Sequence, residues 1–237
     1  MSHEIRNALN VVIGNASLLA RSNLAEKEQK YVKSISISSR ILLGIITHIL
    51  DLSKIEAGEM KLHSNQCDFI TLANEVVEIM SFSAKEKNLK LITNYDPQLS
   101  LKIIGDPNRI QQIMTNLIGN SIKFTEEGSI KVSITSKNKD EDHIQIRLEV
   151  EDSGIGISED KFDCVFKKFS QVDESSTRKF SGTGLGLVIS KELVKMLGGK
   201  IDFKSKIGVG STFWFEIPFL IDRESCNSLD KQDKTHG

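Results

Sequence analysis

Apolar residues recur at steps of three and four along two stretches in the first quarter of the chain. In the first stretch, from Glu4 to about Ala20, they are Ile5, Leu9, Val12, Ala16 and Leu19. In the second they are Tyr31, Ile35, Leu42, Ile45, Ile49 and Leu52, with the polar Ser38 in the same series. Such spacing puts one stripe of side chains on one face of an α-helix, so it predicts two helices.

The two helices are predicted to form an antiparallel hairpin, because the polar interval Arg21–Gln29 between them is short. Gly58 is the expected stop of the second helix. One hairpin cannot bury two apolar stripes together with their flanking Ile and Leu residues. We therefore expect two copies of the hairpin to pair as a four-helix bundle, which makes the chain a homodimer.

Beyond residue 66 helical and strand patterns alternate. Helices are expected at Phe69–Asn88, from Pro107 to about Ile122 with Asp106 as N-cap, and at Leu185–Leu197. Strands are expected at Lys90–Tyr95, Leu101–Ile104, Ser129–Thr135, Ile144–Val150, Lys200–Lys204 and Thr212–Ile217, with a charged turn at Lys137–Asp142. Strands interleaved with helices, the later strands antiparallel, predict a two-layer α/β sandwich.

These patterns divide the 237 residues into four segments. Residues 1–60 form the helical hairpin, 61–66 a linker, 67–220 the α/β domain, and 221–237 a polar tail that we expect to be disordered.

Charge and cysteine usage narrow the class of protein. Thirty-one basic against 32 acidic residues give a net charge of −1, so nothing suggests a nucleic-acid partner. The cysteines Cys67, Cys164 and Cys226 match no disulfide or metal spacing, which favours a reducing compartment. No apolar run reaches the roughly 18 residues that span a bilayer. We expect a cytoplasmic chain without a membrane segment, and a membrane anchor elsewhere in a parent protein stays open.

Two glycine-rich segments bracket a polar stretch in the second half, Asp152–Ile157 and Ser181–Leu187. Closely spaced glycines allow backbone N–H groups to approach an anion. The second segment runs into an apolar helix, and helix N-termini favour phosphates. Together the two segments predict a nucleotide site with a movable lid.

Five segments together resemble the H, N, G1, F and G2 boxes of the sensor histidine kinases, and they occur in that order. They are Ser2–Asn7, Asn116–Thr125, Asp152–Gly156, Phe162–Phe169 and Gly182–Gly186. The resemblance extends to about Phe219 and implies an ATP-binding domain of the GHKL type behind the hairpin. The stretch Phe169–Phe180 resembles the hybrid kinases, which carry a receiver domain after this unit.

The resemblance implies that His3 is the phosphate acceptor. Glu4 resembles the acid that orients or deprotonates the imidazole, and Asn7 resembles the residue that places water or a partner carboxylate during dephosphorylation. Helical geometry puts His3 about 160° around the helix from Ile5, on an outer face shared with Asn7. A neutral imidazole there can attack a phosphoryl group.

The remaining boxes imply a site for ATP and Mg²⁺. Asn116 and Asn120 lie one helical turn apart with Lys123 nearly in line, and amide oxygens suit a Mg²⁺ that also binds phosphates. By resemblance Asn120 is the Mg²⁺ ligand, Asn116 its neighbour and Lys123 a phosphate or ribose contact. The implied adenine-side residues are Asp152, Gly154, Gly156 and Thr212, and the implied lid hinge is Gly182, Thr183, Gly184, Leu185 and Gly186.

The resemblance implies ATP-dependent autophosphorylation of His3 followed by transfer to an aspartate of a receiver domain. Ala8 replaces a frequent proline, and only two residues precede His3, which indicates an N-terminally truncated hairpin. Two alternatives stay open. One is a clamp-type ATPase of the gyrase or chaperone kind, which lacks an acceptor histidine. The other is a nucleotide-binding, phosphatase or scaffold module without autokinase activity. Whether transfer occurs within or between subunits is also open.

Overall fold

The computed structural model describes residues 2–96, 102–137, 142–168, 170 and 184–222, and not the side chains of residues 2, 3 and 137. Its contacts divide the chain into two compact units, Met1–Met60 and Lys61–Gly237.

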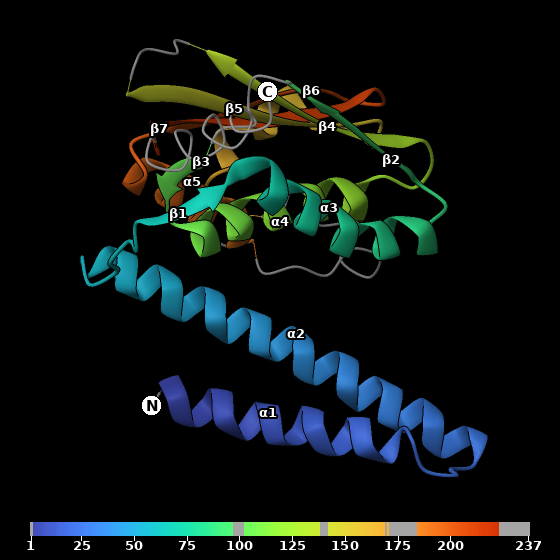
Figure 1. The fold of residues 1–237 in the computed structure, drawn as a ribbon. Helices are drawn as coiled ribbons and strands as arrows, with labels where there is room; N and C mark the ends of the chain where they lie inside the picture. Colours follow the sequence, from blue (N-terminus) through green and yellow to red (C-terminus); the bar gives the residue numbers. More distant parts are fainter. Residues whose placement is uncertain (1, 97–101, 138–141, 169, 171–183, 223–237) are drawn as a thin grey trace, which may run out of the picture. The chain divides into compact units, whose positions relative to one another are not determined.

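The first unit is a hairpin of two helices, α1 (Ser2–Leu19) and α2 (Glu26–Glu56), as the sequence predicts (Figure 1). The second helix begins five residues earlier than its apolar pattern, which starts at Tyr31. Polar contacts explain this early start, because the Glu28 carboxylate accepts a hydrogen bond from the N–H of Ala25 at 3.0 Å and Lys30 pairs with Glu26. Gly58 follows the helix with a φ of +67°, as expected of a helix stop.

The face by which α2 packs within the hairpin differs from most of the predicted stripe, of which Leu52 is the buried member among the described residues. The buried residues of α2 are Val32, Ser39 and Leu52. The stripe residues Tyr31, Ile35, Leu42 and Ile49 keep 42–57% of their surface exposed. Both helices carry apolar residues on more than one face, and periodicity alone cannot tell which face turns inward. A single hairpin therefore leaves much of its predicted stripe in solvent.

α2 also departs from the expectation that no segment is apolar enough to span a membrane. One 18-residue window of this helix has a mean hydropathy of 1.5 with no more than two charged residues. By length and composition it could cross a bilayer, although a single such helix is weak evidence. The exposed stripe accounts for the high hydropathy equally well.

The second unit is a seven-stranded sheet covered on one face by helices, the predicted two-layer α/β sandwich (Figure 1). Its strands are β1 (Asn65–Asp68), β2 (Lys90–Tyr95), β3 (Lys102–Gly105), β4 (Ser129–Lys137), β5 (His143–Asp152), β6 (Lys200–Lys206) and β7 (Gly210–Ile221). The order is β1-β3-β7-β5-β4-β2, with β6 also paired to β7. Only the β2–β4 pair is parallel among the described strands.

The covering helices are α3 (Phe69–Glu86), α4 (Pro107–Phe124) and α5 (Gly186–Met196). Aspartates cap the first two, since Asp68 accepts from the N–H of Thr71 and Asp106 from that of Arg109. Asp106 also accepts from the N–H of His63, so one buried carboxylate holds both the start of α4 and the segment before β1.

Strict alternation along β5 decides which side chains meet the helices. Ile144, Ile146, Leu148 and Val150 are buried, and Asp152 continues the same inward series to the end of the strand. This continuation places a carboxylate on the helix-covered side.

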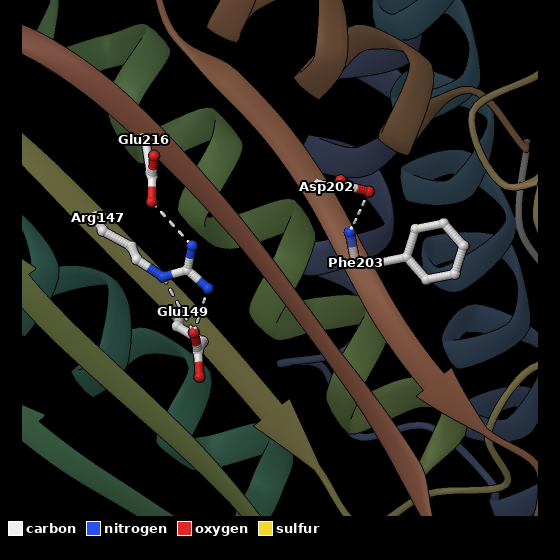
Figure 2. Close-up of polar contacts among 5 residues, drawn as sticks. All are labelled: Arg147, Glu149, Asp202, Phe203 and Glu216. Carbon is white, nitrogen blue, oxygen red and sulfur yellow. Dashed lines mark hydrogen bonds and ion pairs between the residues drawn. The ribbon is translucent and has the colours of Figure 1, made fainter.

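The opposite face of the sheet is charged. Arg147 lies between the carboxylates of Glu149 and Glu216 (Figure 2). Its guanidinium also lies over the ring of Trp214, at 4.5 Å from the ring centre. Burial alone would lower the pKa of Arg147, but its hydrogen bonds to both carboxylates raise it above the ordinary value. This half-buried network holds neighbouring strands in register on the face without helices.

Two segments differ from the sequence prediction at element level. β1 lies partly in the expected linker. The sequence did not predict this strand, because its four residues do not alternate between buried and exposed positions. β7 extends to Ile221, and the N–H of Asp222 bonds to the carbonyl of Lys102, so the ordered chain reaches past residue 220. Most of the predicted turn at 137–142 and the tail beyond residue 222 lie outside the described residues.

Candidate functional site

The carboxylate of Asp152 lies buried where β5 ends, with 8% of the residue exposed. Its Oδ1 accepts hydrogen bonds from the N–H groups of Gly154 (2.9 Å) and Ser211 (3.2 Å), and its Oδ2 accepts one from the Ser121 hydroxyl (3.3 Å). Burial raises the pKa of Asp152, and these three hydrogen bonds oppose the rise. The side chain is thus held rigidly, with acceptor capacity left on Oδ2.

The loop after Asp152 leaves no space for a side chain at two of its positions, Gly154 and Gly156. A Cβ on Gly154 would lie 2.5 Å from the carbonyl oxygen of Phe124. Gly156 has a φ of +71°, and a Cβ there would lie 2.6 Å from the carbonyl carbon of Lys206. The absence of side chains at these two positions therefore lets the loop pass between the end of α4 and the β6–β7 turn.

β7 supplies the next polar residues beside Asp152. Ser211 is the cross-strand partner of Asp152, and Thr212 pairs with Glu151. Both are buried, at 7% and 5% exposed. Paired residues share a face of the sheet, so Ser211 lies on the face of Asp152, whereas the predicted Thr212 lies on the opposite face with Glu151.

The polar face of α4 carries Asn116, Asn120 and Lys123, all half-buried. Burial lowers the pKa of Lys123, whose ammonium lies 4.6 Å from the centre of the Phe124 ring. Asn120 is followed directly by Ser121, which bonds to Asp152. Helix α4 therefore carries the predicted phosphate-side residues and, through Ser121, contacts the predicted adenine-side carboxylate of β5.

Asn116 is tied to α5 by a hydrogen bond that the sequence did not suggest. Its Nδ2 donates to the hydroxyl of Ser190 at 2.7 Å. The first residue of α5, Gly186, packs against the same amide, since a Cβ there would lie 2.9 Å from Cγ of Asn116 and closer still to its Oδ1.

The predicted lid hinge is only partly described. Gly184 has a φ of +66°, and Leu185 is fully buried at the start of α5, so only its backbone could meet a ligand. Gly182 and Thr183 lie outside the described residues.

The residues of the F box pack against β6. Phe162, in the 3₁₀ helix η2 (Glu159–Cys164), and Phe166 meet the ring of Phe203 with centres 5.0 and 5.9 Å apart. Phe203 in turn stacks on Phe213. Figure 2 shows Phe203 projecting from β6 beside Asp202, whose carboxylate accepts from its N–H. Phe169 lies outside the described residues.

The end of α4 is capped by a lysine from the neighbouring helix. Lys87, just after α3, donates to the carbonyl oxygens of Ile122 (2.7 Å), Lys123 (2.9 Å) and Thr125 (3.4 Å). These carbonyls lack partners within the helix and bear the negative end of its dipole. Lys87 thus fixes the last turn of the helix that carries the candidate site.

The predicted acceptor residues lie on α1 of the hairpin. His3 is within the helix, but its side chain is outside the described part of the structure. Glu4 and Asn7, one and four residues further on, are exposed.

The donor set near Asp152 fits ATP with Mg²⁺. A half-buried lysine and two amide side chains offer charge and hard oxygen atoms for phosphates and a divalent cation. No group of three or more His, Cys, Asp or Glu side chains in the described residues could hold a metal ion. The amides and the phosphates themselves would therefore supply the ligands.

Sequence reasoning missed the residues that orient this site, which are Ser121, Ser190, Ser211 and Lys87. Only Ser121 lies inside a recognised motif, and its contact with Asp152 spans 31 residues of sequence.

Two family models match the chain. Residues 1–58 match the His Kinase A (phospho-acceptor) domain, and residues 105–221 match the histidine kinase-, DNA gyrase B- and HSP90-like ATPase. The first match separates this chain from the clamp-type ATPases, which have no such domain.

Curated relatives agree with these matches. "Sensor histidine kinase GacS" of Pseudomonas protegens is 41% identical over 97% of this chain and 25% of its own length. "Hybrid signal transduction histidine kinase B" of Dictyostelium discoideum is 42% identical over 92% of this chain and 11% of its own. The chain thus spans a quarter or less of these relatives. Among solved structures, full-length ShkA in complex with AMPPNP is 32% identical, with a TM-score of 0.76 over 93% of this chain and 45% of that one.

Proposed function

The chain belongs to the histidine kinases, and from that premise we propose that it is a sensor kinase core that transfers the γ-phosphate of ATP to His3. The phosphate then passes to an aspartate of a receiver domain. One observation carries this proposal: a buried carboxylate, Asp152, is hydrogen-bonded to the same helix turn that presents Asn120.

Asp152 recognises the base. Its Oδ1 accepts from two backbone N–H groups, whereas Oδ2 accepts from Ser121 alone among the described residues and keeps a lone pair. The 6-amino group of adenine donates to that lone pair. Guanine presents a carbonyl oxygen at this position, which a carboxylate repels, so the site selects ATP.

The polar face of α4 holds the phosphates. Lys123 supplies positive charge, and Asn120 offers an amide oxygen to Mg²⁺, with Asn116 beside it. When bound, Mg²⁺ neutralises charge on the β- and γ-phosphates. Placement and charge neutralisation are the main contributions a protein makes to phosphoryl transfer.

His3 is the nucleophile. The neutral imidazole forms a nitrogen–phosphorus bond as the bond from the γ-phosphorus to the bridging oxygen breaks, and ADP leaves. Glu4 orients the ring and takes its proton. Asn7 places a water or the receiver carboxylate when the phosphate leaves His3.

The exposed apolar stripe on α2 is covered by a second copy of the hairpin. Tyr31, Ile35, Leu42 and Ile49 are each more than two-fifths exposed in one chain, and a four-helix bundle buries them. The stripe therefore supports a second copy of the chain as one proposed partner. The other proposed partner is the receiver domain that accepts the phosphate, in the cytoplasm.

Labelling with γ-³²P-ATP and Mg²⁺ tests the proposal. We expect an acid-labile, base-stable label on the wild-type chain, lost in His3→Gln and kept in His63→Gln, a matched histidine variant. Label that persists in His3→Gln would refute the acceptor assignment. ATP binding without any label would favour the alternative of a nucleotide-binding module without autokinase activity.

A further inference from the structure

The side chain of Asn116 has a definite orientation. Its Nδ2 donates to the Ser190 hydroxyl at 2.7 Å, which turns Oδ1 toward the backbone of Gly186. Ser190 is 1% exposed, so this contact lies in the interior and water does not compete for it.

Gly186 is best explained by this contact. The residue lies in the first turn of α5, and any Cβ would overlap the amide of Asn116. The absence of a side chain lets α5 approach α4 closely enough for Ser190, one turn later, to reach the same amide. One helix thus holds the amide nitrogen of Asn116 through Ser190 and leaves room for the amide oxygen beside Gly186.

An asparagine side chain without a hydrogen bond can turn either its oxygen or its NH₂ group toward a ligand. The torsion about its last bond is soft, and the two groups are similar in size. A cation or its bound water requires the oxygen. Fixing the nitrogen on Ser190 makes the oxygen the free end before any ligand arrives.

Resting on the proposed function, we propose that Ser190 is a positioning residue that holds the Asn116 amide with its oxygen toward the Mg²⁺–phosphate end of the nucleotide. Ser190 is 1% exposed, so its effect on a ligand acts through Asn116. Because Ser190 follows the lid hinge on the same helix, the position of α5 and the orientation of Asn116 are set together.

Ser190→Ala in the full chain tests this inference by binding. We expect the dissociation constant for Mg²⁺–ATP to rise about fivefold, or about 1 kcal/mol at 1.4 kcal/mol per factor of ten. Adenosine lacks phosphates, so its affinity, measured by competition, should not change. In an Asn116→Ala background the Ser190→Ala substitution should add nothing, because the group it orients is gone.

A second readout needs no nucleotide. The side-chain NH₂ signals of Asn116, assigned with Asn116→Ala, should move upfield in Ser190→Ala as the hydrogen bond is lost. Unchanged NH₂ signals, an equal loss of adenosine affinity, or additive effects in the double variant would each overturn the positioning role. A wild-type chain that binds no Mg²⁺–ATP would instead refute the proposed function, and the NH₂ signals would still decide the contact.

Discussion

The Ser121 hydroxyl donates a hydrogen bond of 3.3 Å to Oδ2 of Asp152, and both residues are buried. The bond joins the last turns of α4 to the end of β5. It also opposes the effect of burial, which raises the pKa of this carboxyl.

Ser121→Ala should therefore raise the pKa of Asp152 further. In the proposed function the adenine amino group donates to the ionised carboxylate, so the fall in ATP affinity at acidic pH should move to higher pH. Binding measured at a series of pH values from 3.8 upward checks this shift. Ser136→Ala is the control, because it removes a similar serine–aspartate hydrogen bond, to Asp96, elsewhere in the sheet. An identical pH profile for Ser121→Ala and wild type would contradict the expectation.

Asp152→Asn should weaken ATP binding by about 1–3 kcal/mol through loss of a charge-assisted hydrogen bond. Titration calorimetry with ATP and GTP measures the loss and the reduced preference for adenine. Glu151→Gln, the exposed neighbour, should bind like wild type. An Asp152→Asn variant with wild-type affinity would exclude the adenine role.

The same substitution should change how stability depends on pH. The raised pKa means that the folded domain holds this proton more tightly than the unfolded chain, whose ordinary value is 3.8. The resulting stability is complete below 3.8 and is lost as pH rises through the folded pKa. Asp152→Asn should lack this contribution and its pH dependence, as denaturant unfolding at a series of pH values will show.

Gly156 and Gly208 provide a matched pair for separating strain from overlap. Their φ values are +71° and +73°, but a Cβ on Gly156 overlaps Lys206, whereas nothing lies within 4 Å of one on Gly208. Gly208→Ala should cost about 1 kcal/mol of stability from backbone strain alone. Gly156→Ala should cost at least about 2 kcal/mol and reduce ATP binding. If urea unfolding gives equal losses of stability for the two variants, the loop at Gly156 accommodates the added Cβ without cost.

Lys87→Met should lower the stability of the α/β domain by about 1 kcal/mol, because three carbonyls at the end of α4 lose their cationic donor. Lys85→Met, at the end of the same helix, is the control and should change stability little. Thermal unfolding of the two variants gives the comparison. A loss of the same size in both would assign the effect to α3 rather than to the cap.

The elements with a clear period were predictable from the sequence. Alternation along β5 places Asp152 on the inner face, and the spacing of Asn116 and Asn120 places them on one side of a helix. The family boxes indicate the chemistry because each box is a short continuous segment that can be read directly from the sequence.

Contacts between distant segments were not predictable. Asn116 and Ser190 are 74 residues apart, and a serine within an apolar helix gives no sign of a buried partner. β1 is too short for a pattern, and its existence depends on pairing with β3. The inward face of α2 could not be chosen because two faces are apolar, and packing between helices makes the choice.

Ser121, which bonds to Asp152, and Asn116, which bonds to Ser190, lie five positions apart on α4. This separation is about 7.5 Å along the helix axis. In the proposed function, a rigid helix therefore fixes the distance between the residues that bind the adenine base and those that bind the phosphates. A ligand must have both groups at that separation to gain both sets of contacts. Selectivity of this kind depends on the length of the ligand as much as on its base or its phosphates. Shorter or longer analogues of ATP should lose the contacts at one end of the site.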